Sequence, residues 1–357
     1  MRRGFITEST TADSTEENPI LERTKKRRQY ANEVIEDRLS DLPDGVILHI
    51  LSLLDTKQVV RTCVLSKRWE HLWKRISTLI LHSSRFSYVK QFTTFVSKIL
   101  TLRDSSTALR VLDVDRNGNF EPRLLKRILN YISSHSTLLQ ELSISVRGDS
   151  SLILSCFSSC RALTSLKLSI YPRDGYTETL FPKSLNLPLL TSLDLTNFAF
   201  CGGESGCAEP FSVFTMLNSL ALSSCKVKDA QILTISSDTL ANLAIHSPLE
   251  EINVDIHDNS SNMPKIELST PSLYTFTYSG SLIQEICGSG LSSVKQVHID
   301  DSREFSASVR HGLLVFNWLL DFANVESLAL SSTTLQVPCH IFSLYYYFLK
   351  MLLFLNL

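Results

Sequence analysis

Large apolar side chains recur along most of the chain in one short pattern. A Leu-like residue is followed after two positions by a second, and after one more position by a third. The alternation at the end of each unit predicts a β-strand with two apolar side chains on one face. The pattern occurs as LRVLDV (109–114), LQELSI (139–144), LTSLKL (163–168), LTSLDL (190–195), LNSLAL (217–222), LANLAI (240–245), LYTFTY (273–278), VKQVHI (294–299) and VESLAL (325–330).

The spacing of these units indicates a repeat protein. Their middle residues are separated by 30, 24, 27, 27, 23, 33, 21 and 31 positions, a mean of 27. That period is typical of leucine-rich repeats, in which only stacked neighbours can cover the inward face of each strand. The full pattern places Asn or Cys three positions after the last apolar residue, and only Asn117 and Cys225 fulfil this. We therefore expect an irregular α/β solenoid over 77–335.

The segments between the strands predict different connections. EPRLLKRILNYISS (121–134) carries apolar residues at helical spacing, whereas 197–212, with Gly202, Gly203 and Gly206, predicts loops. In each strand the residue between the two inward side chains points to the opposite, outward face. This outward set is Ser143, Lys167, Asp194, Ala221, Ala244, Thr277, His298 and Ala329. It shows no charge stripe, which argues against a nucleic-acid groove.

A separate apolar stretch, LPDGVILHILSLLDTKQVVRTCVLSKRWEHLW (42–73), predicts three short helices. Its first apolar residues recur at i, i+3, i+4 and i+7, and helix starts are marked by Pro43, by Asp55 with Gln58, and by Ser66. The third helix would carry Trp69, Leu72 and Trp73. Helices this short are marginal alone, and about 40 residues bury little surface. The unit should therefore dock on the rest of the chain or on a partner.

Both termini differ in composition from the repeats. Residues 1–35 are polar and predict a disordered segment, in which RTKKRR (23–28) is either a nuclear import signal, an anion-binding site or a solvated charge run. Residues 336–357 end in IFSLYYYFLKMLLFLNL (341–357), which is apolar at 14 of 17 positions. It is shorter than the roughly 20 residues of a membrane span and contains Lys350. It shows no repeat pattern and no polar cap, which the end of a solenoid should have. The alternatives are a buried terminal helix or strand pair, a gene model that runs past the reading frame, and a tail anchor.

Composition narrows the classes of function. The 357 residues are 43% hydrophobic and 20% charged, with a net charge of −1, so charge makes no case for nucleic acid or an anionic membrane. The eight cysteines form no CxxC pair or zinc spacing, and the first residues lack an apolar signal-peptide core. We expect a reducing compartment, no cofactor and no metal. Nucleophile-elbow, phosphate-loop and zinc-protease motifs are missing, so we expect no catalysis.

The order of these features resembles the plant F-box/LRR family. The resemblance is specific over about 40 residues and looser over the repeats. The residues that carry it are Asp37, Arg38, Leu39, Ser40, Leu42, Pro43, Asp44, Ile50, Leu51, Thr56, Lys57, Val60, Thr62, Leu65, Ser66, Lys67, Arg68, Trp69, Leu72 and Trp73. It implies an α+β protein with an N-terminal three-helix F-box (36–76) followed by an irregular α/β leucine-rich-repeat solenoid. Family members often carry a further C-terminal domain.

The same resemblance implies a non-catalytic subunit of a Skp–cullin–F-box ubiquitin ligase in the nucleus or cytoplasm. The F-box would dock on the Skp-type adaptor, and through it on a cullin, by Leu42, Pro43, Ile50, Leu51, Leu54, Val64 and Trp69. The alternative for each residue is internal packing, which we favour for Leu72 and Trp73. The repeats would bind an unknown target protein, with Ser143, Lys167, Asp194, Thr277 and His298 as candidate contacts. We expect no nucleic-acid or membrane partner.

Three other functions stay open at this point. The chain could be a leucine-rich-repeat scaffold outside any ligase, which adaptor binding would decide. It could be a truncated form that occupies the adaptor without delivering a target. It could also be a hormone co-receptor, for which the insertions 171–186 or 253–265 would have to build a pocket.

Overall fold

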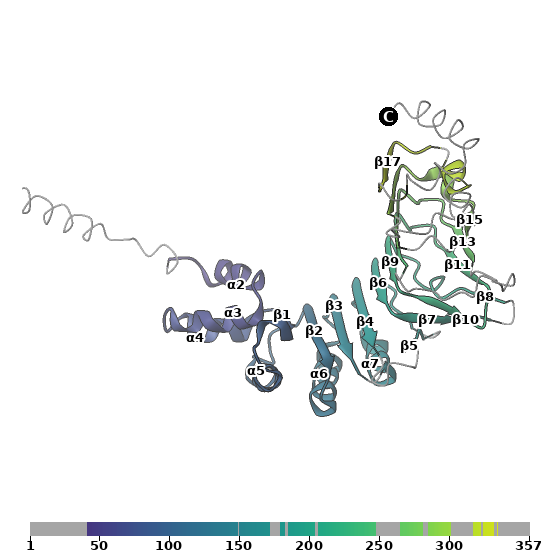
Figure 1. Ribbon diagram of the computed structural model, residues 1–357. Helices are drawn as coiled ribbons and strands as arrows, with labels where there is room; N and C mark the ends of the chain where they lie inside the picture. Colours follow the sequence, from purple (N-terminus) through teal and green to yellow (C-terminus); the bar gives the residue numbers. More distant parts are fainter. Residues whose placement is uncertain are drawn as a thin grey trace, which may run out of the picture. The chain divides into compact units, whose positions relative to one another are not determined.

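The computed structural model describes residues 41–148, 150–171, 179–182, 185–203, 206–247, 265–280, 285–300, 317–322, 324–331 and 334, with the backbone alone of Asn117 and Ser158. The predicted disordered segment, the apolar tail and most of the two insertions lie outside the described residues. The chain divides into two compact units, 1–47 and 48–357. The first unit contributes the start of helix α2, and the second contains the remaining elements described here (Figure 1).

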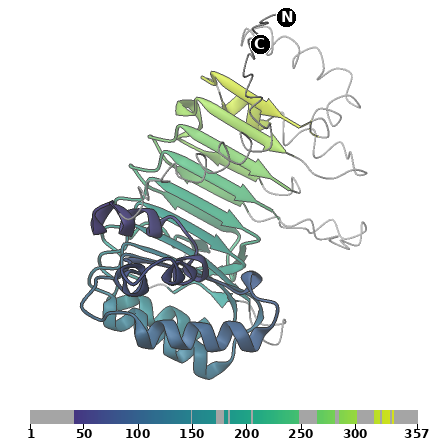
Figure 2. The same cartoon turned by 90° about the vertical axis from the view of Figure 1, so that its left-hand side faces the viewer.

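A ten-stranded parallel sheet forms one side of the second unit. Its strands lie side by side in the order in which they occur along the chain. The strand numbers missing from that order belong to two smaller sheets. Figure 2 shows them as a stack of similar arrows. The strands are β1 (Thr78–His82), β2 (Val111–Asn119), β3 (Glu141–Arg147), β4 (Ser165–Tyr171), β6 (Ser192–Thr196), β9 (Ser219–Ser223), β12 (Asn242–His246), β14 (Thr275–Ser279), β16 (Gln296–Asp300) and β17 (Ser327–Leu330).

The register of this sheet aligns the repeated apolar residues. One inward row runs from Leu79 to Leu328 and a second from Leu81 to Leu330, each with one side chain per strand. All nine predicted units therefore form strands of one sheet. β1 adds a tenth unit, ISTLIL (76–81), which fits the same pattern at the start of the predicted repeats.

The opposite side of the solenoid changes along the chain. Next to β1–β4 it consists of helices, and in the later repeats strands replace them (Figure 1). The helical part contains α5 (Val89–Leu102), α6 (Pro122–His135), α7 (Ser150–Ser155) and η4 (Cys156–Ser159). The predicted helix at 121–134 is confirmed as α6, whose apolar face is buried.

Two smaller parallel sheets complete the later repeats. One contains β5 (Thr179–Leu180), β7 (Phe198–Cys201) and β10 (Lys226–Lys228), and the other β8 (Cys207–Ala208), β11 (Ile232–Ser236), β13 (Lys265–Ser269) and β15 (Glu285–Gly288). The prediction of loops over 197–212 is therefore wrong in part, since β7 and β8 lie within it. The buried side chains of Phe198 and Phe200 pack against Phe181, with ring centroids 5.9 and 5.8 Å away. That packing outweighs the local preference of the glycines for turns.

Short helices form the N-terminal region that the sequence predicts as the F-box. They are α2 (Asp44–Ser52), α3 (Thr56–Arg61), η1 (Thr62–Val64), α4 (Trp69–Leu72) and η2 (Trp73–Arg75). The predicted start at Asp55 is confirmed, because its carboxylate accepts a hydrogen bond from the Gln58 amide at 2.9 Å. Together these elements make an α+β protein, as the sequence predicts.

Candidate partner-binding surfaces

The helices after α2 pack around a small apolar core. Val59, Trp69, Leu72, Trp73 and Ile76 are all buried. The two tryptophans lie on α4 and η2, at neighbouring turns of the chain. Their burial means that this core is complete within the chain itself, without a partner.

Another set of apolar side chains in the same segment faces solvent. Ile50 is 37% exposed, Leu53 71%, Val64 83% and Leu65 60%. These four residues are called the exposed F-box group below. Ile50 and Leu53 lie at the end of α2 and just after it, and Val64 and Leu65 lie at the end of η1 and just after it. Exposed apolar side chains that form a continuous patch are typical of interaction sites, which makes this group a candidate.

The seven residues predicted to contact the adaptor lie in different environments. Pro43, Ile50 and Val64 are exposed, Leu42 and Leu54 are half-buried, and Leu51 and Trp69 are buried. Their role at the adaptor stays a prediction. Leu53 and Leu65 were not among them. Leu53 lies off the apolar helical face through Ile47, Ile50, Leu51 and Leu54. An apolar residue at such a position indicates an exposed side chain, and this signal was available in the sequence.

Hydrogen bonds connect these helices to the first strand of the sheet. The buried hydroxyl of Thr56 accepts a hydrogen bond from the amide of Ile80 in β1 at 2.9 Å. Nearby, the Lys57 ammonium lies 4.3 Å from the centre of the Phe86 ring and donates to the carbonyl of Arg85. Helix α3, which continues into η1 with Val64, is therefore fixed to the edge of the repeats.

A buried arginine strengthens this connection. Arg103 is only 5% exposed and ends helix α5. Its Nε and Nη2 donate to the carbonyl of Ile76 at 3.1 and 2.9 Å, and Nη2 also donates to that of Ala108 at 2.9 Å. Its Nη1 donates to the Tyr131 hydroxyl of α6 at 2.9 Å. One side chain thus joins the end of the F-box helices to the first two repeats.

The outward face of the ten-stranded sheet is the second candidate surface. The predicted outward residues form one row in register across the strands: Ser143, Lys167, Asp194, Ala221, Ala244, Thr277, His298 and Ala329, preceded by Asp113. Whether they contact a target stays a prediction. Their position is that of a continuous, solvent-facing row.

Charge is unevenly distributed along this row. Lys167 and Asp194 on neighbouring strands form an ion pair at 2.7 Å, and His82 contacts Asp113 at 2.8 Å. From β9 to β14 the row consists of Ala221, Ala244 and Thr277, none of which carries charge. The early strands therefore offer paired charges, and the middle strands offer a flat floor of small side chains.

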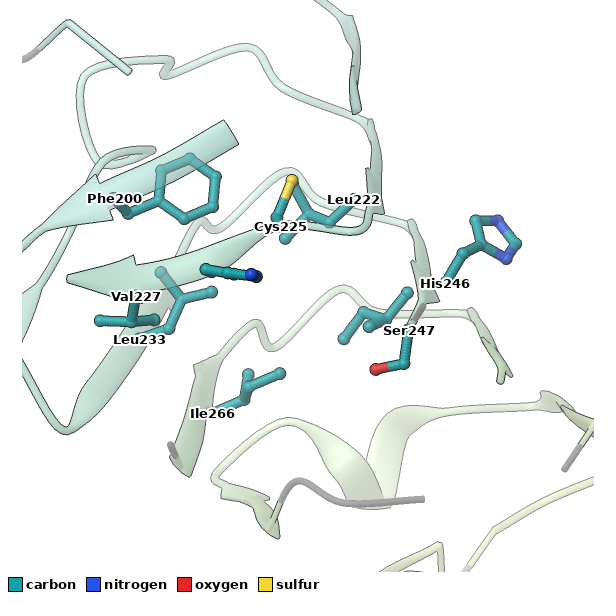
Figure 3. Close-up of a pocket in the computed structure, with 10 residues that line it drawn as sticks. Phe200, Leu222, Cys225, Val227, Leu233, His246, Ser247 and Ile266 are labelled. Atoms are coloured by element: carbon teal, nitrogen blue, oxygen red, sulfur yellow. The ribbon is translucent and has the colours of Figure 1, made fainter. Parts of the chain in front are cut away.

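Inside the solenoid, a small cavity lies near the end of β9 (Figure 3). Its lining includes Phe200, Leu222, Cys225, Leu233 and Ile266, and its solvent-sized space of about 20 Å³ holds about one water molecule. Burial raises the pKa of the Cys225 thiol to about 11. The thiol is therefore protonated at neutral pH and instead donates a hydrogen bond to the Leu195 carbonyl at 3.5 Å. The cavity therefore has room for a structural water.

One repeat earlier, Asn197 likewise donates a side-chain hydrogen bond to a carbonyl of the preceding repeat, as Cys225 does. Its backbone is left-handed, with φ of 66°, a conformation that Asn tolerates better than most residues. Its side-chain amide donates to the Ile170 carbonyl at 3.3 Å. The predicted spacing found Cys225 and missed Asn197, which stands two positions after the last inward Leu of its strand instead of three.

Other kinds of site were sought in the described part of the chain. It holds no group of three or more His, Cys, Asp or Glu side chains arranged to bind a metal ion. No helix among the described residues is long and apolar enough to cross a membrane. The candidate surfaces are thus the exposed F-box group and the outward face of the sheet.

Comparison with known proteins matches the first of these regions to a family. Residues 39–81 match the F-box domain, so the match contains the exposed F-box group. It also contains β1, whose edge the F-box helices hold.

Relatives in Arabidopsis thaliana match most of the chain. F-box/LRR-repeat protein 13 is 27% identical over 84% of this chain and 66% of its own length. An F-box/FBD/LRR-repeat protein is 26% identical over 84% of this chain and 62% of its own length. An FBD-associated F-box protein is 27% identical over 67% and 51%. The chain thus spans about half to two thirds of the relatives it matches, and the resemblance to plant F-box/LRR proteins is confirmed.

Proposed function

We propose that this chain, with its F-box domain and its homology to F-box/LRR-repeat proteins, is the target-binding subunit of a Skp–cullin–F-box ubiquitin ligase. The F-box would bind the Skp-type adaptor, and the adaptor would connect the chain to the cullin. The outward face of the repeats would hold the protein to be ubiquitinated. The place of action would be the nucleus or the cytoplasm.

The exposed F-box group carries the proposal. Its four apolar side chains are exposed, whereas the neighbouring tryptophans are buried in the core of the segment. Helical segments that present apolar side chains commonly dock in a groove of a partner protein. An adaptor that covers Leu53 and Val64 would remove the two most exposed apolar side chains of this group from water.

The connection to the repeats suits the same function. A ligase subunit of this kind needs no chemistry of its own, since it raises the effective concentration of a target lysine near a separate conjugating enzyme. That effect depends on geometry, and a stiff connection maintains it. The Thr56 and Arg103 hydrogen bonds supply stiffness between the F-box helices and the first strands.

Co-purification of the full chain with a Skp-type adaptor tests the proposal. We expect the Leu53→Glu/Val64→Glu variant to lose the adaptor, because two carboxylates would be buried without partners. The matched control is Leu189→Glu/Met216→Glu, whose positions in the repeats are 47% and 50% exposed, and it should retain the adaptor.

Failure would take a specific form. If the folded natural chain does not bind the adaptor, the repeats belong to a scaffold that acts outside a ligase. If the natural chain and the Leu53→Glu/Val64→Glu variant bind equally, the exposed F-box group is not the contact. In the second case, Leu42→Ala/Pro43→Ala tests whether the adaptor binds elsewhere on the F-box, because the family resemblance assigns both residues to the adaptor independently of their exposure.

A further inference from the structure

The solvent side of helices α5 and α6 carries positive charge without any acidic residue. The two helices lie side by side next to the first strands, and the Arg127 side chain of α6 donates a hydrogen bond to the Thr101 hydroxyl of α5 (Figure 1). Neither helix contains an aspartate or a glutamate, although the whole chain has 36 acidic and 35 basic residues. The exposed cations of these helices, called the basic helical face below, are Lys90, Lys98, Arg123, Lys126 and Arg127.

Several of these cations stand where they do not stabilise their helix. Lys90 and Arg123 are the second residues of α5 and α6, at the end of a helix where negative charge is favourable. Arg123 also precedes Lys126 and Arg127 by three and four positions, a spacing at which like charges repel. In the described part of the chain, no member of the basic helical face forms an ion pair. Residues that break local rules in this way are expected at functional sites.

A buried arginine adds charge where these helices begin. Because α5 and α6 each connect two neighbouring parallel strands, they run in the same direction and start at the same edge. Arg116 of β2 is 8% exposed, and its guanidinium carbon lies 5.3 Å from the centre of the Phe120 ring, just before α6. Its Nε and Nη1 have no hydrogen-bond partner among the described residues. Glu121 offsets only one of the charges of Lys90, Arg123 and Arg116.

We propose that the basic helical face binds an acidic segment of a partner protein, rich in Asp and Glu. Its carboxylates would pair with cations that the described chain leaves unpaired, and arginine binds a carboxylate through two parallel hydrogen bonds. This surface goes beyond the proposed ligase function and does not rest on it. The helices cover the opposite side of the solenoid from the outward face of the sheet, so the two surfaces can be occupied at once.

The charge of the whole chain favours a protein segment over a nucleic acid or an anionic membrane. The chain carries a net charge of −1, and exposed charges act over about 8 Å at physiological salt. A short acidic segment would meet the local cations alone. A long polyanion or a membrane surface would also meet the acidic residues that surround them, and these would repel it.

Fluorescence anisotropy of a labelled oligoglutamate peptide, titrated with the full chain, tests the inference. We expect Lys90→Glu/Arg123→Glu to weaken binding by at least about tenfold, because two attractive contacts become repulsive. Glutamate in the first turn favours a helix, so the melting temperature of this variant should not fall. The matched control, Lys226→Glu/Lys228→Glu, makes the same change of charge at exposed positions of β10 and should bind within about twofold of the natural chain.

Four results would overturn the inference. A natural chain that does not bind the peptide would mean that the basic helical face is only solvated charge. Equal weakening by both variants would mean that net charge attracts the peptide. An oligouridylate or a phosphatidylserine vesicle that binds more tightly than the peptide at the same salt would mean that the partner is a nucleic acid or a membrane. A lower melting temperature of Lys90→Glu/Arg123→Glu would mean that these cations serve the fold.

Failure of this inference is distinguishable from failure of adaptor binding. Leu53→Glu/Val64→Glu leaves the basic helical face unchanged, so it should lose the adaptor and retain the oligoglutamate peptide. Lys90→Glu/Arg123→Glu leaves the exposed F-box group unchanged and should show the reverse.

Discussion

Replacing Arg103 by Met removes the hydrogen bonds that join the F-box helices to the first repeats. The natural side chain is 5% exposed and makes four hydrogen bonds, two to Ile76 and one each to Ala108 and Tyr131. Methionine retains much of the apolar stem and no donor. The carbonyls of Ile76 and Ala108 would then stay buried without this partner.

The expected loss of stability follows from these contacts. A hydrogen bond to a charged group contributes about 1.5–3 kcal/mol, and a buried carbonyl left unpaired costs about 1–3 kcal/mol. Desolvation of the guanidinium offsets part of this, since burying a charge is itself unfavourable. We therefore expect Arg103→Met to lower the free energy of unfolding of this region by about 3 kcal/mol. Tyr131→Phe removes one of the four bonds and should cost about 1 kcal/mol.

Urea unfolding followed by tryptophan fluorescence measures the effect. Trp69 and Trp73 lie beside Ile76 in the sequence and report on the F-box helices, while Trp318 reports on the last repeats. Arg127→Met is the matched control, because that arginine contacts Thr101 at an exposed position and its loss should cost a few tenths of a kcal/mol at most. An Arg103→Met midpoint within error of the Arg127→Met midpoint would refute the account of this connection.

Four further predictions concern other parts of the second unit. Burial raises the pKa of Cys156 to about 12 and that of Cys225 to about 11, so both thiols should resist alkylation at pH 8 until the chain unfolds, measured by mass spectrometry of labelled peptides. Because the folded-state pKa values are the higher ones, these thiols should also lower stability as pH rises from about 9 toward 11–12, which denaturation midpoints at each pH would show. Gly288→Ala should cost at least about 1–3 kcal/mol, since φ is 141° and the added Cβ would lie 1.9 Å from the Leu268 carbonyl oxygen; an unchanged melting temperature would contradict this. Lys167→Ala should change stability by about 1 kcal/mol or less, because its ion pair is exposed to solvent, so a large drop in melting temperature would show a structural role that the outward position does not predict.

The repeat strands were predictable from the sequence because their signal is periodic. Each unit places two apolar residues two positions apart, and the spacing from Leu112 to Leu328 gives the order of the strands as well as their inward faces. The outward positions of Lys167 and Asp194 follow from the same alternation, although the ion pair between them required the register of β4 and β6.

The F-box side chains could not be sorted by period alone. Leu51 and Ile50 lie on the same predicted helical face, yet one is 1% and the other 37% exposed. Which side of a short helix is buried depends on the tertiary structure around it and not on its period alone. Arg103 was missed for a related reason, since a single arginine after a helix gives no pattern until the carbonyls around it are known.

The central claim is that the F-box binds a Skp-type adaptor through exposed apolar side chains. Titration calorimetry of the full chain with the adaptor at several temperatures tests it most directly. We expect binding with a negative heat-capacity change, the signature of apolar burial, and its loss in Leu53→Glu/Val64→Glu but not in Leu189→Glu/Met216→Glu. A folded chain that binds no adaptor, or a Leu53→Glu/Val64→Glu variant that binds as the natural chain does, would contradict the claim.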